Sequence, residues 1–433
     1  MDWNQVFYQI YPLGMCGAPK ENDGITVSRI LRILDFIPHY QKMGITAIWF
    51  SPVFESDRHG YDTRDYRKID CRLGTNEDFK AVCKALHKAG IKVILDGVFN
   101  HVGRGFFGFK DVQEKKWDSP YTDWFYINYN DTWAEDGFTY ENWEGHNELV
   151  KLNLQNPEVK NYLLDSVDKW MEDYEIDGLR LDVAYMVDRN FLYELQEHTK
   201  AKNPNFFLLG EMIGGDYNVL LNDCRLDSVT NYECRKGIYS SFNTHNMFEI
   251  GFSLNRQFGP EYWTLYKGRH LLSFVDNHDV DRITSVLNDE RDIPLAYDMI
   301  YAMPGMPCIY YGSEWGLEGK KTNGCDDPLR PEVTSMQWNT ITDHIALLSS
   351  IRKEHPVLAD GSYRQVYLQN EQLVFERCIE TERMLFAINI ADHPVHINFD
   401  AGTTQGMDVA TKEMISFDGG VELAAKSAYF WIA

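Results

Sequence analysis

Charged side chains stand at the ends of several short apolar runs in the sequence. These positions are Asp96 in "VILDGV", Arg180 and Asp182 in "GLRLDVA", Glu211 in "FFLLGE", and His278 with Asp279 in "VDNHD". Side chains of a strand alternate between its faces, so Arg180 and Asp182 share one face. The neighbouring apolar residues share the other face: Leu179, Leu181 and Val183. Such a charged pair is either a buried structural ion pair or half of an active site.

Acids at four strand ends, together with an arginine and two histidines and without a metal-ligand cluster, suit glycoside hydrolysis. That reaction uses one carboxylate as nucleophile and one protonated carboxyl as general acid. Arg180 would lower the pKa of Asp182 and keep it ionised, as a nucleophile requires. Burial and neighbouring carboxylates would raise the pKa of Glu211, as a general acid requires. For any single Asp after a strand, a helix N-cap is the alternative reading.

The elements that must position these groups are eight β-rich apolar runs, each followed by a segment of helical character. The runs are "VFYQIYP", "TAIWFSP", "KVILDGV", "GLRLDVA", "FFLLGE", "DSVTN", "LLSFVDN" and "MPCIYYG". Intervening segments such as "EDFKAVCKALHKAG" show apolar residues at helical spacing and stop at a glycine. Strands alternating with helices in eight units predict a closed (β/α)8 barrel (TIM barrel), in which catalytic groups gather at the C-terminal ends of the strands.

Two regions depart from this alternation. Residues 101 to 155 follow the third strand and hold ten aromatic residues between positions 117 and 146, which predicts an inserted subdomain forming one wall of a cleft. Beyond about residue 355 alternating strands predict an antiparallel β domain, a sandwich. The predicted divisions are therefore a barrel at 1–100 and 156–354, the insert at 101–155 and the C-terminal domain at 355–433.

Composition limits the partners. A formal net charge of −23 argues against nucleic acid, because phosphate binding draws on clustered Lys and Arg. The start "MDWNQVFYQIYP" resembles no signal peptide, and no apolar stretch is long enough to span a membrane. The eight cysteines show no metal-ligand spacing and are expected to be free thiols. A cytoplasmic protein acting on short imported or intracellular oligosaccharides is expected.

At this point the sequence resembles the α-amylase superfamily, glycoside hydrolase family 13. The motifs that carry the resemblance are "DGVFNH", "GLRLDVA", Glu211, "FVDNHD", "HGYDTRDY", "KLNLQNPEV" and "GMPCIYYGSEWG", in order over roughly residues 3 to 330. The resemblance implies that Asp182 is the nucleophile and Glu211 the acid/base. It makes Asp279 the third acid, which holds substrate hydroxyls and stabilises the transition state.

The same resemblance assigns substrate-binding residues around the cleavage point. It implies that His101 and His278 hydrogen-bond the sugar and that Tyr61 stacks on its ring, while Asp96 and Arg180 belong to the same site. The family commonly has an Asp and an Arg, separated by three residues, in the loop after the eighth strand. Asp326 has that spacing to Arg330, whereas Asp327 has the Asp-Pro context, so the motif leaves both open.

Within the family the chain looks most like the neopullulanase, cyclomaltodextrinase and maltogenic amylase group. Those enzymes usually carry an extra N-terminal β domain, whereas this chain begins at the first barrel strand, which puts their domain-linked dimer in doubt. The chemistry requires no cofactor. Asn100 matches a calcium ligand of many α-amylases, but Val183, Ala184 and Tyr185 replace a Lys-His pair often found after the nucleophile. One oxygen ligand falls short of the six to eight that calcium takes, so a structural calcium ion stays open.

Three functions compete. The first is a retaining hydrolase of α-1,4-glucosidic bonds in maltooligosaccharides or other α-glucans. The second is an α-glucan transglycosylase of the 4-α-glucanotransferase kind, in which a sugar hydroxyl replaces water. The third is a non-enzymatic binding protein, which predicts lost catalytic acids that this sequence retains.

Overall fold

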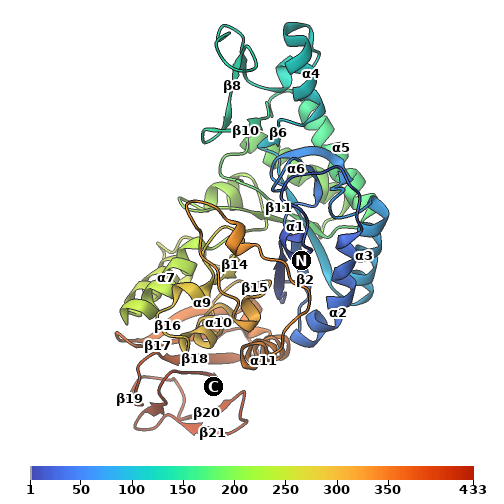
Figure 1. Ribbon diagram of the computed structural model, residues 1–433. Coiled ribbons are helices and arrows are strands. Elements are labelled where there is room, and N and C mark those ends of the chain that lie inside the picture. Colours follow the sequence, from blue (N-terminus) through green and yellow to red (C-terminus); the bar gives the residue numbers. More distant parts are fainter. Residues whose placement is uncertain (1) are drawn as a thin grey trace.

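The computed structural model describes residues 2–433, and its centre is a barrel of eight parallel strands (Figure 1). The strands in order around the barrel are β13 (Ser228–Val229), β12 (Phe207–Gly210), β11 (Gly178–Leu181), β5 (Lys92–Gly97), β2 (Ala47–Phe50), β1 (Phe7–Ile10), β15 (Met306–Tyr310) and β14 (Leu272–Phe274). A parallel bridge between Thr230 and Leu272 joins the two ends of this order. The predicted (β/α)8 barrel is confirmed, and all eight apolar runs form its strands.

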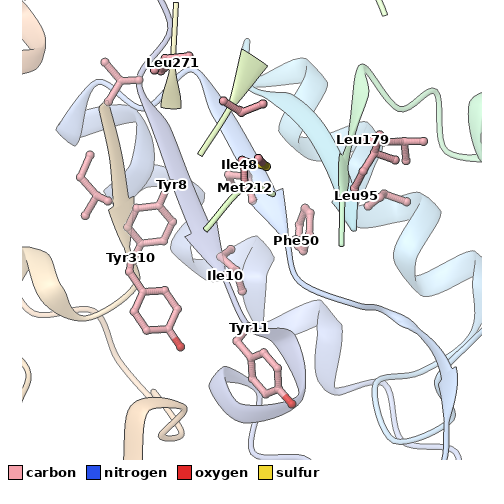
Figure 2. Packing of buried hydrophobic residues seen from close by; sticks show 14 of the residues in the cluster. Tyr8, Ile10, Tyr11, Ile48, Phe50, Leu95, Leu179, Met212, Leu271 and Tyr310 are labelled. Atoms are coloured by element: carbon pink, nitrogen blue, oxygen red, sulfur yellow. The ribbon is translucent and has the colours of Figure 1, made fainter. Parts of the chain in front are cut away.

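Alternation along the strands gives the barrel two apolar layers. Phe7 and Trp49 belong to the cluster inside the barrel, whereas their neighbours Tyr8 and Ile48 belong to the cluster between strands and helices. Figure 2 shows side chains of this outer cluster, among them Tyr8, Ile48 and Leu179. Because the outer face of the barrel is mostly apolar, helices must cover it.

The covering helices carry their apolar residues on one stripe. In α3 (Asn76–Lys88) the buried residues Phe79, Val82, Cys83 and Leu86 recur at helical spacing, and Thr75 with Asp78 forms a capping box at its start. The other long helices are α2 (Arg32–Met43), α5 (Pro157–Asp173), α6 (Arg189–Lys202), α7 (Tyr232–Thr244), α8 (Phe248–Phe258), α10 (Asp292–Ala302) and α11 (Thr340–Glu354). The short helical segments are α1 (Pro12–Met15), η1 (Arg29–Leu31), η4 (Val219–Asp223), α9 (Ile283–Val286), η5 (Ser313–Trp315), η6 (Asp327–Leu329) and α12 (Val357–Asp360).

The segment between β5 and α5 leaves the barrel and forms the protrusion at the top of Figure 1. It contains β6 (His101–Gly103), α4 (Phe107–Lys115), η2 (Lys116–Asp118), η3 (Thr122–Trp124), β7 (Ile127–Asn128), β8 (Thr139–Tyr140), β9 (Asn142–Trp143) and β10 (His146–Lys151). Its small core is aromatic: Phe106, Phe109, Phe125 and Phe138 are buried. A hairpin of β3 (Phe54–Ser56) and β4 (Thr63–Ile69) follows β2. Tyr61 lies in the loop between these two strands.

An antiparallel sheet at the C-terminus lies at the opposite end of the view in Figure 1. Its six strands are β16 (Ser362–Leu368), β17 (Gln372–Cys378), β18 (Arg383–Asn389), β23 (Ser427–Ile432), β20 (Gln405–Asp408) and β21 (Met414–Ser416), and a separate pair is formed by β19 (Val395–Ile397) and β22 (Val421–Leu423). One face of the sheet joins the large core cluster, and β16 packs against α8. The expected antiparallel β fold of this region is confirmed, while the domain boundaries stay predictions.

The expected alternation fails at one point of "GLRLDVA". Leu179 and Leu181 lie in the outer cluster as expected, but β11 ends at Leu181. Val183 then has a φ of +39° and lines a cavity together with Asp182 and Glu211 instead of following them. A positive φ is costly for a β-branched residue, so the chain turns sharply here under strain.

Across residues 2–433, none of the helices combines the length and the apolar character needed to cross a membrane.

Candidate active site

The strand register brings three predicted acids around one arginine. Arg180 is paired with Asp96 of β5, and Asp182 and Glu211 each follow directly after a paired end of β11 and β12. The Arg180 Nη1 lies 2.8 Å from Asp96 Oδ1 and 2.9 Å from Asp182 Oδ1, and its Nη2 lies 2.6 Å from Glu211 Oε1. All four side chains are buried. Residues far apart in sequence therefore form one cluster, as the barrel topology predicts.

One guanidinium does not neutralise three buried carboxylates. Burial raises the pKa of Asp182 well above its ordinary value, and Glu211 and Asp96 add to the rise, although Arg180 acts in the opposite direction. Arg180 lowers the pKa of Asp182 as expected, but burial and the competing acids outweigh it, so the net direction is upward. Burial also raises the pKa of Asp96 and of Glu211, the latter in the predicted direction.

Glu211 is held by a second donor from the turn after the nucleophile position. The Val183 backbone N–H donates to Glu211 Oε2 over 2.8 Å. This N–H belongs to the residue with the positive φ, so the strained turn aims a donor at the candidate general acid. Asp182 and Glu211 are thereby tied together through both Arg180 and the main chain.

The third predicted acid lies in a different electrostatic environment. Asp279 Oδ2 lies 2.9 Å from His278 Nε2 and its Oδ1 lies 2.9 Å from Arg330 Nη2. Burial alone would raise the pKa of Asp279, but His278 and Arg330 outweigh it and hold that pKa well below the ordinary value. Asp279 is therefore the acid of the site whose surroundings favour its ionised form.

Tyr61 and His278 connect the two groups of acids. The Tyr61 hydroxyl donates to Asp96 Oδ2 over 3.1 Å and makes a short contact with His278 Nε2. The two rings are stacked, with centroids 5.6 Å apart and 12° between their planes. Gln9 of β1 fixes the other side of the histidine, with its Nε2 at 2.6 Å from His278 Nδ1. Gln9 is not among the predicted site residues. The signal that could have indicated it is a polar residue facing inward on a barrel strand.

His101 lies on the other side of Asp182. Its Nε2 is 3.9 Å from Asp182 Oδ2, is buried and has no hydrogen-bond partner among the described residues. Burial lowers the pKa of His101 to about 3, so the ring is neutral. A buried ring nitrogen without a partner, at the edge of a cavity, is available to a substrate hydroxyl.

The loop after β15 places Asp326 and Asp327 in different surroundings. The sequence had not shown which of the two lines the site. Asp326 Oδ2 lies 3.1 Å from Arg330 Nη2 and lines the same cavity as Asp182. Asp327 instead pairs with Lys20 at the surface and does not line that cavity. Lys321, which lies 2.8 Å from Asp326 Oδ1, also lines it, and no pattern in the sequence pointed to this residue.

These groups open into one cavity of about 530 Å³, a size typical of small-ligand sites. The inserted segment supplies part of its wall through Trp143, His146 and Glu148. Around Glu211 the wall is mostly apolar and aromatic, from Tyr185, Ile213 and Tyr232. Tyr232 begins α7 shortly after the sixth barrel strand. Its place near the C-terminal end of a barrel strand is the sequence signal that could have indicated it.

Asn100, the expected calcium ligand, contacts its neighbour in the chain. Its side-chain Nδ2 lies 3.2 Å from His101 Nδ1. In the described part of the chain, one group of three acidic, thiol or imidazole side chains could share an ion: Glu55, Asp70 and Cys71. Asp70 is already paired with Arg72 at 2.7 Å and Glu55 with Lys68 at 3.3 Å. These residues do not fit calcium, which takes oxygen ligands in larger number, and calcium dependence stays untested.

Comparison with known proteins agrees with this geometry. The family described as "Alpha amylase, catalytic domain" matches residues 9–368. The maltogenic α-amylase of Bacillus acidopullulyticus is 30% identical over 99% of this chain and 76% of its own length. Neopullulanase 2 of Thermoactinomyces vulgaris is 37% identical over 75% of this chain and 58% of its own length. A solved cyclomaltodextrinase structure superposes with a TM-score of 0.87 at 26% identity, over 99% of this chain and 78% of that one. The family match and the buried acids at the barrel rim lead to the same conclusion: the chain belongs to the α-amylase family of glycoside hydrolases, enzymes that retain anomeric configuration.

Proposed function

We propose that the chain hydrolyses α-1,4-glucosidic bonds of maltooligosaccharides, with Asp182 as nucleophile, Glu211 as acid/base and Asp279 as transition-state stabiliser. The observation that carries the proposal is the Arg180 cluster. One guanidinium lies within 3 Å of carboxylates on three adjacent strands, beside a cavity that also holds Asp279.

In the first step, an Asp182 oxygen bonds to the anomeric carbon of the bound sugar. The bond between that carbon and the glycosidic oxygen breaks, and Glu211 donates its proton to the departing oxygen. The positive charge that develops on the ring is stabilised by Asp279, whose low pKa keeps it ionised. The product of this step is a covalent glycosyl–Asp182 ester.

In the second step, Glu211 acts as a base. Esterification removes the negative charge of Asp182, and a neighbouring negative charge is one cause of a raised carboxyl pKa, so the pKa of Glu211 falls. Glu211 then accepts a proton from water, whose oxygen bonds to the anomeric carbon as the ester bond breaks. Two inversions at one carbon retain its configuration.

The register of β11 and β12 supports the short distance between the Asp182 and Glu211 carboxyl groups that a retaining mechanism needs. Retaining enzymes hold their two carboxyl groups about 5 to 5.5 Å apart, and inverting enzymes hold them farther apart. Asp182 and Glu211 follow paired residues of neighbouring strands, and such strands lie about 4.8 Å apart. The Glu211 N–H also donates to Leu181 O over 3.0 Å, which continues the ladder to the catalytic position.

Transglycosylation is the second candidate, and one observation favours it. Tyr185, Ile213 and Tyr232 give the Glu211 side of the cavity an apolar surface, on which an acceptor sugar can stack in place of water. Chromatography of products from maltotriose separates the two activities. Products longer than maltotriose indicate transfer, whereas glucose and maltose alone indicate hydrolysis.

We further propose that the protein works in the cytoplasm on soluble short glucans. The support is the state of the cysteines: all eight lie within the described residues and are unpaired, and six of them are buried. Free thiols are typical of a reducing compartment. Strong adsorption to raw starch granules would contradict this proposal.

The deciding experiment combines stereochemistry with a variant of the nucleophile. Proton NMR of the first product released from an α-linked substrate should show the α anomer. Asp182→Asn should lower turnover by about 10⁴-fold or more while the protein stays folded. A β anomer at early times, or near-normal turnover of Asp182→Asn, would show that Arg180 and Asp182 form a structural ion pair.

A further inference from the structure

A cavity of about 850 Å³ lies at the end of the barrel away from the catalytic acids. It lies between the N-terminal ends of β14 and β15 and the C-terminal region, and its lining includes residues 267–270, 359–364 and 376–380. Catalytic groups follow the C-terminal ends of the strands, and this cavity shares no lining residue with the catalytic one. We call it the junction cavity, because both the barrel and the antiparallel sheet supply its wall.

A fully buried arginine takes part in this lining. Arg377 of β17 donates five hydrogen bonds, all to main-chain carbonyl oxygens, over 2.8 to 3.2 Å. The acceptors are Ala302, Leu358, Gly361 and Ser362. Within residues 2–433 Arg377 forms no ion pair. Carbonyl dipoles replace the lost water but carry no net charge, so the buried guanidinium lacks a direct counter-charge.

A second buried arginine lies next to the first. Arg352 and Arg377 both donate to the Leu358 carbonyl oxygen, over 3.2 and 3.1 Å. Arg352 likewise forms no ion pair among the described residues, and its buried Nε has no acceptor there. Burial lowers the pKa of Arg377 to about 9, and Arg352 adds to the fall. Two neighbouring buried cations without a carboxylate partner make the surrounding potential positive.

Exposed cations complete the lining. Lys267 and Arg269 are exposed, and neither is paired with a carboxylate in the part of the chain that the structure describes. The Lys267 Nζ donates to a main-chain carbonyl oxygen, and Arg269 donates to an asparagine side chain. A further exposed cation, Arg364, shares the carboxylate of Glu376 with Arg383. The cavity therefore combines buried positive charge with exposed donors that a ligand can reach.

The acidic residues do not balance these cations. The lining holds three carboxylates, Asp360, Glu376 and Glu380, and the four cations Lys267, Arg269, Arg364 and Arg377. Arg352 and Arg383 adjoin it and carry two further positive charges. This excess of positive charge occurs in a chain whose formal net charge is −23.

His270 of the same lining responds to this charge. Burial lowers the pKa of His270 to about 4, Asp360 opposes the fall, and Arg377 and Arg352 add to it. The imidazole is therefore neutral at pH 7 and leaves the carboxylate of Asp360, 3.5 Å away, without a charged partner there.

An anion supplies the charge that this cavity lacks. Phosphate suits it best, because arginine and lysine side chains give a phosphate several charge-assisted hydrogen bonds. The cavity is far larger than a phosphate ion alone, and Phe258, Pro260 and Ile379 add apolar surface to it. Asp360 and Glu380 offer acceptors for hydroxyl groups. A ligand that matches all of these features carries a phosphate group on a compact, hydroxylated organic body.

We propose that the junction cavity binds a small phosphorylated metabolite of the hexose monophosphate kind, with its phosphate group held by Lys267 and Arg269 beside the buried Arg377. Binding joins the barrel to the antiparallel sheet and stabilises the folded protein. The inference does not rest on the proposed glycosidase activity, since none of these residues lines the catalytic cavity.

Titration calorimetry of the whole chain with glucose 6-phosphate, inorganic phosphate and glucose tests the proposal. Glucose 6-phosphate should bind about tenfold or more tightly than inorganic phosphate, and glucose should bind far more weakly than either. At about 100 times its Kd, glucose 6-phosphate should raise the melting temperature by about 3 °C or more.

A double variant removes the two exposed cations. Lys267→Gln combined with Arg269→Gln should weaken glucose 6-phosphate binding by about 10- to 100-fold, because the charge-assisted hydrogen bonds to the phosphate are lost. Both positions are exposed, so the buried packing stays intact. The matched control is Lys80→Gln combined with Lys84→Gln, at two exposed lysines of α3 outside the cavity. It changes the net charge equally and should bind as the unchanged protein does.

Cys378 gives a second measurement that leaves the cations unchanged. Its thiol is free and half-buried in the lining, six other cysteines are buried, and Cys325→Ser removes the exposed one. In this variant, glucose 6-phosphate should slow alkylation of Cys378 by iodoacetamide severalfold, whereas glucose should not.

Each outcome decides the matter. Binding of neither phosphate compound, equal losses in the two double variants, or an unchanged rate of Cys378 alkylation would overturn the proposal. Weaker binding in the Lys267 and Arg269 double variant alone, together with slower alkylation, supports it. Equal affinities for glucose 6-phosphate and inorganic phosphate would identify free phosphate as the ligand of this phosphate site.

Discussion

Replacement of Arg180 by lysine keeps the positive charge but removes the planar fork that contacts three carboxylates. One lysine nitrogen cannot reach Asp96, Asp182 and Glu211 at 2.6 to 2.9 Å simultaneously, so at least one charge-assisted hydrogen bond is lost. Each such bond contributes about 1.5 to 3 kcal/mol. If the loss falls on the transition state, kcat/KM should decrease by about 10- to 150-fold.

Another buried arginine provides the matched control. Arg352 is fully buried and donates to the carbonyl oxygens of Trp3, Gly305 and Leu358, far from any catalytic acid. Arg352→Lys should lower the melting temperature but leave kcat/KM of the folded enzyme within about twofold. The assay is hydrolysis of maltotriose, alongside thermal unfolding. An Arg180→Lys enzyme with kcat/KM close to that of Arg352→Lys would refute a catalytic positioning role for Arg180.

Three further predictions concern the cavity. Glu211→Gln should lower kcat/KM for maltotriose by about 10²- to 10⁴-fold, but far less for α-maltosyl fluoride, whose leaving group needs no proton; equal losses on both would refute its role as acid. Trp143→Ala should raise KM for maltooligosaccharides about 2- to 10-fold with little change in kcat, whereas Trp133→Ala, at a side chain 80% exposed outside the cavity, should change neither. Asp182→Asn should raise stability at pH 7, since burial raises the pKa of this carboxyl and folding then penalises its ionised form. That penalty is absent below the unfolded pKa and grows until the pH reaches the folded pKa, so the gain in melting temperature should shrink toward pH 4.

The barrel could be predicted from the sequence because each strand carries its own local signal. Short apolar runs ending in a polar residue predict buried parallel strands whatever surrounds them, and all eight formed. The end of one helix was indicated in the same way: α3, within "EDFKAVCKALHKAG", ends at Lys88, and Gly90 just beyond it has a φ of +78°.

The loops of the site could not be predicted in the same way. Asp326 and Asp327 are adjacent and chemically identical, and only the loop conformation turns one toward Arg330 and the other toward Lys20. Lys321 and His59 likewise reach the cavity from loops without periodicity. The alternation of a strand fixes the face toward which each side chain points, whereas a loop has no such regular pattern.

The net rise in the pKa of Asp182 has a cause that "GLRLDVA" alone does not show. That run contains one arginine and one aspartate, which would form a neutral pair. The register adds Asp96 and Glu211 to the same guanidinium, and the barrel removes water from all of them. Burial and these two further carboxylates together raise the pKa of Asp182. A substrate whose ring gains positive charge in the transition state supplies that charge where the protein lacks it. In the proposed mechanism the positive charge that develops on the sugar ring therefore meets an excess of carboxylates around Arg180, beside a Glu211 that the Val183 N–H already holds.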